Sequence, residues 1–269
     1  MCLRTISHRL FQGISSSELP INSITTKPRK MITNTGAKSL IFIIGFSFFI
    51  SLSGTGQYSD YGKITFERKT NLLKRFDNPR MRNMINEDNK IKIDKFELLF
   101  NDTSSVFRPI QDVSEGRMGW MTTKNYYYQY LGEESQFIIL GLFGQNVYIK
   151  DSLPQRQWKI TESKRNIGGY DCRKAMYEKN DSTRIYAWYS TELTTPIGPE
   201  GYCGLPGTIL GLATEDGGIV YFAKSIELIA PKNEDLTPDK GKNKVFTLVQ
   251  LKAKIEKERK KIRKTWLLC

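Results

Sequence analysis

The sequence contains a single histidine, His8, and it lies in residues 1–56, which we predict to be removed during export. Imidazole is the usual general base of serine triads and the commonest side-chain ligand of zinc and copper. The chain that follows this leader therefore lacks the residue on which such catalytic and metal sites depend. We accordingly predict no catalytic residue, no metal site and no cofactor from the sequence.

The sequence also lacks a hydrophobic run long enough to cross a membrane. Its longest apolar stretch, Ser39–Leu52, has 14 residues. These rise about 21 Å as a helix, against about 30 Å of hydrocarbon core. Lys38 precedes the stretch, and Gly54 and Gly56 occupy positions −3 and −1 of a cut before Gln57. This order is typical of a signal peptide. A transmembrane anchor is the alternative, and we predict no span in the mature chain.

Residues 1–56 are predicted to be a leader and signal peptide, with Met31 as the expected translation start. Signal peptides usually span about 15 to 30 residues, and the segment from Met31 to Gly56 falls within that range. We therefore expect an exported protein, located in the periplasm or at the periplasmic face of the outer membrane.

Acidic residues are fewer than basic residues, so the chain is strongly positive. It has 41 Lys and Arg against 28 Asp and Glu, a net charge of +13. Residues 1–56 hold six of the basic and one of the acidic residues, so the mature charge is +8. Much of this excess lies in the run Lys252–Lys264, which is either a solvated helix face or a weak surface for lipid head groups or acidic proteins. Because exported proteins seldom meet nucleic acid, we predict no nucleic-acid partner.

Cysteine is scarce: only Cys172, Cys203 and Cys269 follow the leader, and none has the Cys-X-X-Cys spacing of redox sites. In an exported protein a spaced pair favours a disulfide over a metal site. We predict a bond between Cys172 and Cys203, with Cys269 unpaired. It would close a loop of about 30 residues, for which chain-entropy arguments give on the order of 3 to 4 kcal/mol.

Apolar residues alternate with polar residues in several short segments, which predicts a mainly β fold. In GKITFER and KFELLFND, the residues on one side of each strand are apolar: Ile64, Phe66, Phe96, Leu98 and Phe100. Further strand-like runs are YYYQYL, QFIILGLF and NVYIK. The charged stretch Asn71–Lys92 is predicted to be a linker or short helix between strands.

Two hairpins are predicted from turn signals. CRKAMYEK and RIYAWYS flank Asn180–Ser182, and we expect Ala175 and Ala187 to be their small, close-packing positions. TILGLAT and GIVYFAKSIEL flank Glu215–Gly218, which contains the Asp-Gly pair typical of tight turns.

Beyond Pro231 the pattern changes to a linker and a basic helix, residues 232–269. Apolar residues recur there at near-helical spacing: Val245, Leu248, Leu251, Ile255 and Ile262. We therefore predict one β-rich domain, residues 57–231, followed by a long C-terminal helix. The sheet is expected to be antiparallel and bent, or a partial barrel, with the half-barrel of lipoprotein carriers as one analogy.

Five motifs between Trp158 and Leu210 follow one another: WKI, GYDCRKA, AWYSTEL, Gly198-Pro199 and GLPGTIL. In this order they resemble the GLPGLI family of exported proteins from Bacteroidota, which is named after the last motif. Thr208 departs from the family motif, which has leucine there. The resemblance extends from Gly62 to near Ile229. It implies a β-rich protein of the periplasm or outer membrane and no particular activity.

The motif loop contains residues with restricted or unusual backbone freedom. Pro206 fixes its own φ and pushes Leu205 towards an extended conformation, while Gly204 and Gly207 permit positive φ or close backbone approach. Gly198 and Pro199 precede them in the same stiff loop. Such a loop can either seal the end of a sheet or present a fixed surface.

Aromatic residues near the motif form a candidate apolar groove: Trp158, Trp188, Tyr189 and Tyr202. Ordinary core is the alternative, because only half of a strand's aromatics face any one side. Charged residues near the motif are expected to be solvated or paired: Arg184, Glu192, Glu200 and Asp216.

The sequence favours a non-enzymatic binding module over an enzyme. We expect it to engage a lipid, a peptide or an envelope protein, of which an outer-membrane transporter is one candidate. A histidine-independent enzyme using carboxylates or thiols, and a purely structural envelope protein, are the alternatives.

Overall fold

The computed structural model describes residues 58–110, 119–142, 144–180 and 183–266 of the chain. All of them belong to one compact unit, Thr55–Cys269. The predicted leader and signal peptide and the predicted unpaired Cys269 lie outside the described residues. Within the described ranges, no helix has both the length and the apolar character that spanning a membrane requires.

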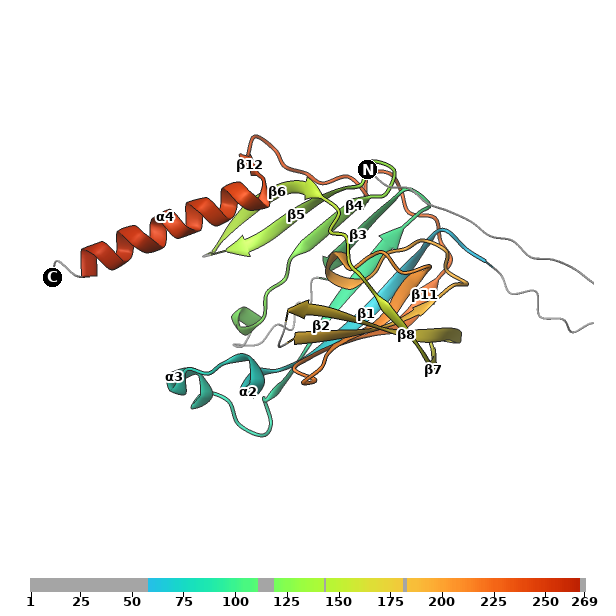
Figure 1. Cartoon of the computed structure of the whole chain (residues 1–269), viewed down its shortest axis with the longest axis horizontal. Helices are drawn as coiled ribbons and strands as arrows, with labels where there is room; N and C mark the ends of the chain where they lie inside the picture. The colour runs from blue at the N-terminus through green and yellow to red at the C-terminus, as the bar shows by residue number, and fades with distance from the viewer. Residues whose placement is uncertain (1–57, 111–118, 143, 181–182, 267–269) are drawn as a thin grey trace, which may run out of the picture. The chain divides into compact units, whose positions relative to one another are not determined.

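The protein is mainly β, as predicted, and its strands belong to a single open sheet (Figure 1). The strands are β1 (Gly62–Asn71), β2 (Ile91–Phe100), β3 (Ser104–Pro109), β4 (Tyr126–Tyr130), β5 (Ser135–Leu142), β6 (Gln145–Ser152), β7 (Lys159–Ile167), β8 (Tyr170–Asn180), β9 (Thr183–Ser190), β10 (Thr208–Thr214), β11 (Ile219–Glu227) and β12 (Val245–Phe246). The helices are α2 (Leu72–Arg75), α3 (Pro79–Arg82), α4 (Leu248–Trp266) and the short 3-10 turns η1 (Gly119–Met121) and η2 (Pro199–Gly201).

The sheet consists of two meanders joined at β1. The strand order is β12-β6-β5-β4-β3-β2-β1-β11-β10-β9-β8-β7, so β1 lies between the meander β2–β6 and the meander β7–β11. Neighbouring strands are antiparallel except β12, which pairs in parallel with β6. Consecutive strands joined by short turns pair with each other, which is the favoured outcome of short connections.

Both predicted hairpins are confirmed. Ala175 of β8 lies directly opposite Ala187 of β9, as expected for two small residues that let the strands pack closely. Strands β10 and β11 pair around the Asp-Gly turn. The stretch predicted as a linker or short helix, Asn71–Lys92, contains the single-turn helices α2 and α3.

The main core lies on the face of the sheet that carries Ile64, Phe66 and Phe96, here called the inner face. The motif loop, residues 191–207, folds over this face and buries Leu193 and Leu205 against it. These two leucines make the loop part of the main core. The opposite face of β2–β5 packs against Leu236 of the linker.

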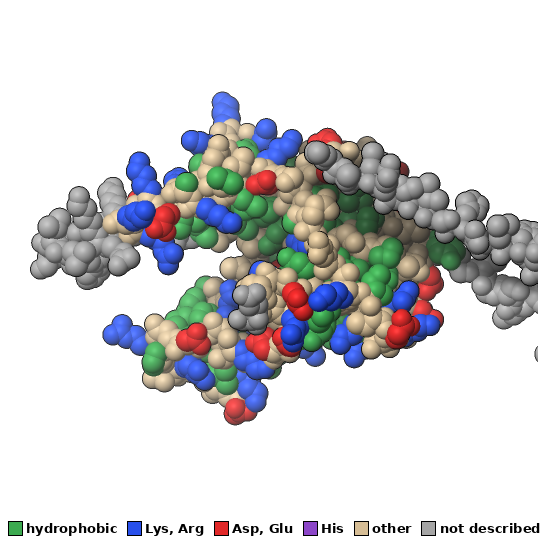
Figure 2. Space-filling model, in the orientation of Figure 1, with side chains coloured by type: hydrophobic (Ala, Val, Ile, Leu, Met, Phe, Trp, Pro, Cys, Tyr) green, Lys and Arg blue, Asp and Glu red, His purple; other side chains and the backbone are tan. Residues whose placement is uncertain are grey.

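The predicted C-terminal helix is confirmed, with one correction. Val245 is not helical: it lies in β12 and pairs with Tyr148 of β6. The helix starts later because Thr247 caps it, its hydroxyl accepting a hydrogen bond from the Gln250 N–H (3.2 Å). The Gln250 side chain in turn accepts from the Thr247 N–H (3.1 Å), which completes a capping box. Figure 2 shows Lys and Arg side chains along α4.

Candidate functional site

A buried ion pair lies on the inner face, where β1 pairs with β2. Arg68 and Asp94 are direct cross-strand partners. Arg68 Nη2 donates to Asp94 Oδ2 at 2.8 Å, and the two side chains are only 4% and 1% exposed. Buried charges need partners, because moving a charged side chain out of water without compensation costs several kcal/mol. Removing one partner of a buried ion pair destabilises a protein by about 3 to 5 kcal/mol.

Further cations surround Asp94. Lys92 Nζ lies 2.8 Å from Asp94 Oδ1, and Lys124 Nζ lies 3.9 Å from the same oxygen. Burial raises the pKa of Asp94, but hydrogen bonds from Lys92 and Arg68 outweigh it and hold the pKa below its usual value. Asp94 is therefore a carboxylate that the folded protein keeps ionised.

On its other side, Arg68 meets Tyr221 of β11, its cross-strand neighbour. Arg68 Nη1 donates to the Tyr221 hydroxyl at 3.4 Å. Its guanidinium carbon lies 4.7 Å from the centre of the Phe96 ring, at cation–π distance. Burial raises the pKa of Tyr221, so this phenol stays protonated and donates its proton onward.

The hydrogen bond from the Tyr221 hydroxyl is accepted by Glu200, which lies at the tip of the motif loop. Tyr221 Oη donates to Glu200 Oε1 at 2.5 Å, and Arg68 Nη1 lies 3.6 Å from the same oxygen. Unlike Asp94, the Glu200 side chain is 28% exposed. Arg68, Asp94, Tyr221 and Glu200, here called the Glu200 network, thus connect a fully buried carboxylate to one that solvent reaches.

The backbone of Glu200 is in the left-handed region, with φ 52° and ψ 31°. A non-glycine residue there costs on the order of 1 to 2 kcal/mol relative to ordinary helical geometry. The following residue, Gly201, also has a positive φ, and its carbonyl accepts hydrogen bonds from Gln129 Nε2 and Arg156 Nη1, both at 3.2 Å. The tip of the loop is therefore fixed from strand β4 and from the β6–β7 connection.

Glycines let the rest of the loop return closely to the sheet. A Cβ on Gly207, whose φ is 145°, would lie 2.1 Å from the carbonyl oxygen of Ser190. A Cβ on Gly198 would lie 2.6 Å from the Cβ of Ile209. The Ile209 N–H donates to the carbonyl of Ile197 at 2.8 Å. Only glycine at both positions allows this packing, which places Glu200 over Tyr221.

The other motif residues fasten the second half of the loop. Gly204 has a φ of 92°, and Leu205 is 2% exposed within the core. Around Pro206 the chain turns tightly, so that the Gly207 N–H donates to the Leu205 carbonyl at 2.8 Å. Trp158 Nε1 donates to the Cys203 carbonyl at 3.0 Å, which ties the loop to the residue before β7.

The four aromatics predicted as a groove do not lie together. Trp158 and Tyr202 are neighbours, with ring centres 6.3 Å apart. Tyr189 is 1% exposed and belongs to the core. Trp188 precedes it on β9 and so faces the opposite side of the sheet, where its ring lies 6.4 Å from that of Phe222. Of the four aromatic residues, Trp158 and Tyr202 thus form a pair beside the loop.

The predicted disulfide is absent: Cys172 and Cys203 are both free, buried cysteines. The Cys172 sulfur lies 3.5 Å from the carbonyl oxygen of Tyr170, whereas the Cys203 sulfur lies 3.5 Å from Arg156 Nη1. One thiol is held in the core by β8 and the other in the loop beside Arg156. Spacing along the sequence suggested the pair, but the fold gives each thiol different neighbours.

Both thiols should be unreactive in the folded protein. Burial raises the pKa of Cys172 to about 12, and burial also raises the pKa of Cys203. We expect slow alkylation by iodoacetamide at about pH 7 in the native state and full alkylation of both after unfolding without reductant. Peptide mass spectrometry measures this, and a Cys172–Cys203 linked peptide or rapid native labelling would contradict it.

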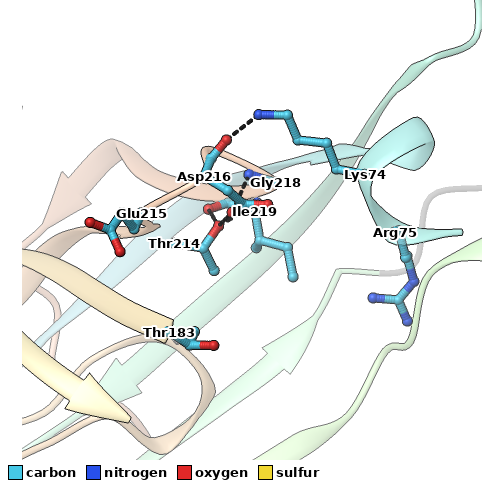
Figure 3. Close-up of a pocket in the computed structure, with 8 residues that line it drawn as sticks. All are labelled: Lys74, Arg75, Thr183, Thr214, Glu215, Asp216, Gly218 and Ile219. Atoms are coloured by element: carbon cyan, nitrogen blue, oxygen red, sulfur yellow. Dashed lines mark hydrogen bonds between the residues drawn. The ribbon is translucent and has the colours of Figure 1, made fainter. Parts of the chain in front are cut away.

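A separate recess of about 480 Å³ lies beside the β10–β11 turn (Figure 3). It is lined by Lys74, Arg75, Thr183, Thr214, Glu215, Asp216, Gly218 and Ile219. Thr214 Oγ1 and the Gly218 N–H donate to the Asp216 carboxylate at 2.6 and 2.9 Å and lower its pKa, while Lys74 donates to the Asp216 carbonyl. Asp216 is thus bonded within the turn and to Lys74, while Glu215 pairs with Arg184 of β9, and we assign this recess a structural role.

The remaining charged residues near the motif are paired on the surface. Arg184 Nη1 lies 2.9 Å from Glu215, and the Glu192 carboxylate accepts from the Asp171 N–H at 3.3 Å. Across the described ranges, no three His, Cys, Asp or Glu side chains gather closely enough to hold a metal ion.

Arg68 and Asp94 are not among the residues predicted for a site, although the sequence carries a signal for both. Arg68 follows Ile64 and Phe66 at the same two-residue spacing, and Asp94 precedes Phe96 at that spacing. A charged residue in phase with the apolar side of a strand indicates a buried charge. What the pattern does not show is the strand register that makes the two residues partners.

The comparisons with known proteins bear on the fold. No protein-family model matches the chain, and no curated protein sequence matches it. Among solved structures, the chain is similar to PNGF-II in two space groups, at 15% and 18% identity, each with a TM-score of 0.50. The matches cover 72% and 74% of this chain but only 33% of the PNGF-II chains, so this chain spans about a third of their length. At this identity the likeness supports a β-rich fold alone.

Proposed function

We propose that this chain is an exported, non-enzymatic binding module of the cell envelope that holds its ligand at Glu200. The observation that carries the proposal is the geometry of this carboxylate: it is partly exposed, fixed by a buried network, and held in a left-handed backbone conformation. Strained backbone persists where the surroundings enforce it, and such sites cluster at ligand-binding positions. A carboxylate needed only for solubility requires neither the strain nor the network.

The chemistry of Glu200 limits the kind of ligand. A carboxylate has about four lone-pair sites, and Tyr221 occupies one of them. The exposed part of Glu200 can therefore accept hydrogen bonds from hydroxyl, amide or amine groups. A lipid head group, a peptide or a protein surface in the envelope can present such donors.

Binding is favoured over catalysis because the other reactive groups are inaccessible or inactive. Asp94 is buried and paired, so Glu200 has no second accessible carboxylate in the network. Two-carboxylate hydrolysis requires both groups at the substrate. The thiols of Cys172 and Cys203 have raised pKa values and are poor nucleophiles when protonated.

The location proposed here rests on the signal-peptide pattern of residues 31–56 and on the resemblance to the GLPGLI family. A second candidate function is an enzyme that uses Glu200 alone as an acid or base, and the same fixed carboxylate favours it. The two candidates differ in what happens to the ligand, because an enzyme would convert it and a binding module would release it unchanged.

Native mass spectrometry of gently purified full-length protein tests the proposal. Wild type should carry a co-purified ligand, and Glu200→Gln should retain about tenfold less, as expected for loss of one charge-assisted hydrogen bond. Glu178→Gln is the matched control, because Glu178 is an exposed, ion-paired carboxylate on β8 outside the network.

Equal retention by wild type and Glu200→Gln, or no ligand in any gentle preparation, would contradict the proposed role of Glu200. The recovered ligand can also be added back to fresh protein. If the protein then alters it chemically, the result would favour the enzyme instead.

A further inference from the structure

The C-terminal helix α4 is strongly basic from Lys252 onward. It has 19 residues, of which eight are Lys or Arg and two are Glu. Within the part whose side chains are described, every residue from Lys252 to Lys260 is exposed. Such a density of one charge is unfavourable for the isolated protein and favours an anionic partner.

The beginning of α4 packs on the sheet. Leu251 is 7% exposed and contacts the core formed by Ile138 and Ile149. One turn further on, Ile255 is 36% exposed, and Figure 1 shows the helix continuing past the edge of the sheet. The spacing of Leu248, Leu251 and Ile255 continues in the sequence through Ile262 and Trp266 at helical intervals. Within residues 248–260, the apolar side of the helix is therefore covered at Leu251 and partly exposed at Ile255.

An apolar groove lies beside Leu251 and Ile255. It has a volume of about 260 Å³ and is lined by Leu142, Gln145, Val147, Phe246, Leu251, Lys254, Ile255, Glu258 and Arg259. The ammonium of Lys254 lies 5.0 Å from the centre of the Phe246 ring, and that of Lys244 lies 5.2 Å from it. The groove thus combines mainly apolar residues with two basic side chains, Lys254 and Arg259, and one acidic side chain, Glu258.

We propose that α4 and its groove dock the protein onto an anionic phospholipid surface. An apolar stripe flanked by Lys and Arg is the pattern by which helices lie in a membrane interface, with the apolar side among the acyl chains and the cations at the head groups. A second copy of this chain would bring two strongly basic helices together, so self-association through α4 is disfavoured. This surface is separate from Glu200 and does not depend on the ligand bound there.

Co-sedimentation of the full chain with phospholipid vesicles tests the proposal. We expect binding to vesicles of phosphatidylcholine with phosphatidylglycerol at a ratio of about 7:3, and at least tenfold weaker binding to pure phosphatidylcholine. Raising NaCl to about 0.5 M should also weaken binding to the anionic vesicles about tenfold, because salt screens the head-group charges.

A pair of triple variants separates α4 from net charge. The first replaces Lys252, Lys257 and Lys260 by Gln, and the second replaces Lys159, Lys164 and Lys179 by Gln, three lysines that are also exposed and lie on β7 and β8. We expect the α4 variant to bind phosphatidylglycerol vesicles about 10- to 100-fold more weakly and the control to bind like wild type. Ile255→Gln should weaken binding several-fold with the charge unchanged.

Equal weakening in both triple variants would overturn the assignment to α4, because only net charge would then matter. Binding to neutral vesicles as strong as to anionic ones would also overturn it. An acidic protein would be the partner instead if two results were found together. The protein would stay bound to polyglutamate beads in the presence of excess phosphatidylglycerol vesicles, and Ile255→Gln would bind the beads as strongly as wild type.

Discussion

Replacing Asp94 by Asn should lower the free energy of unfolding by about 3 to 5 kcal/mol at pH 7. Arg68 is only 4% exposed and loses its closest charged partner, so its buried guanidinium keeps only the more distant Glu200 carboxylate, 3.6 Å from Nη1. Urea unfolding followed by tryptophan fluorescence measures the change. Glu178→Gln, which removes an exposed carboxylate, should leave the free energy of unfolding nearly unchanged.

The effect of Asp94→Asn should depend on pH in one direction. The pKa of Asp94 is lowered in the folded protein, whereas an aspartate in the unfolded chain has a pKa of about 3.9. A lowered folded pKa gives stability that is present above the unfolded pKa and is lost as the pH falls through the folded value. The stability difference between wild type and variant should therefore shrink below about pH 4. A difference that stays constant into strong acid would contradict the ion pair.

Replacing Gly207 by Ala should destabilise the protein by about 3 kcal/mol or more. Two effects add: the φ of 145° is unfavourable for alanine, and the new Cβ would lie 2.1 Å from the Ser190 carbonyl oxygen. Backbone atoms form the obstacle, so no side-chain rotation relieves it. Thermal unfolding monitored by circular dichroism gives the shift in melting temperature.

Gly132→Ala is the matched control for this substitution, because a Cβ on Gly132 meets no atom within 4 Å. Its melting temperature should stay close to that of wild type. If Gly207→Ala melts at the same temperature as Gly132→Ala, the loop does not pack against β9 as described. The loop would then not hold Glu200 in the position described.

Much of the fold could be predicted because it depends on local pattern. The β8–β9 hairpin follows from two alternating segments around a turn. The register that places Ala175 opposite Ala187 also needs a one-residue shift between Glu178 and Asn180, which the turn signal does not show. The basic helix follows from its spacing. Its start at Leu248 also has a local cause, the capping box of Thr247 and Gln250, which the apolar spacing alone does not show.

The rest depends on contacts between distant parts of the chain. Arg68 and Asp94 meet because β1 and β2 pair in one register, and Tyr221 joins them from β11, 153 residues beyond Arg68. Conversely, Cys172 and Cys203 lie close in sequence, yet the strand and the loop give them different neighbours. Alternation along β9 predicts that Trp188 and Tyr189 face opposite sides but not what covers each side.

The role of Glu200 is tested most directly by a crystal structure of the gently purified protein with its co-purified ligand. We predict a hydroxyl or N–H group of the ligand within about 3.2 Å of a Glu200 carboxylate oxygen, with Tyr221 still donating to Oε1. A ligand seated in the recess beside Asp216, with Glu200 facing only Tyr221 and solvent, would contradict the proposed binding site.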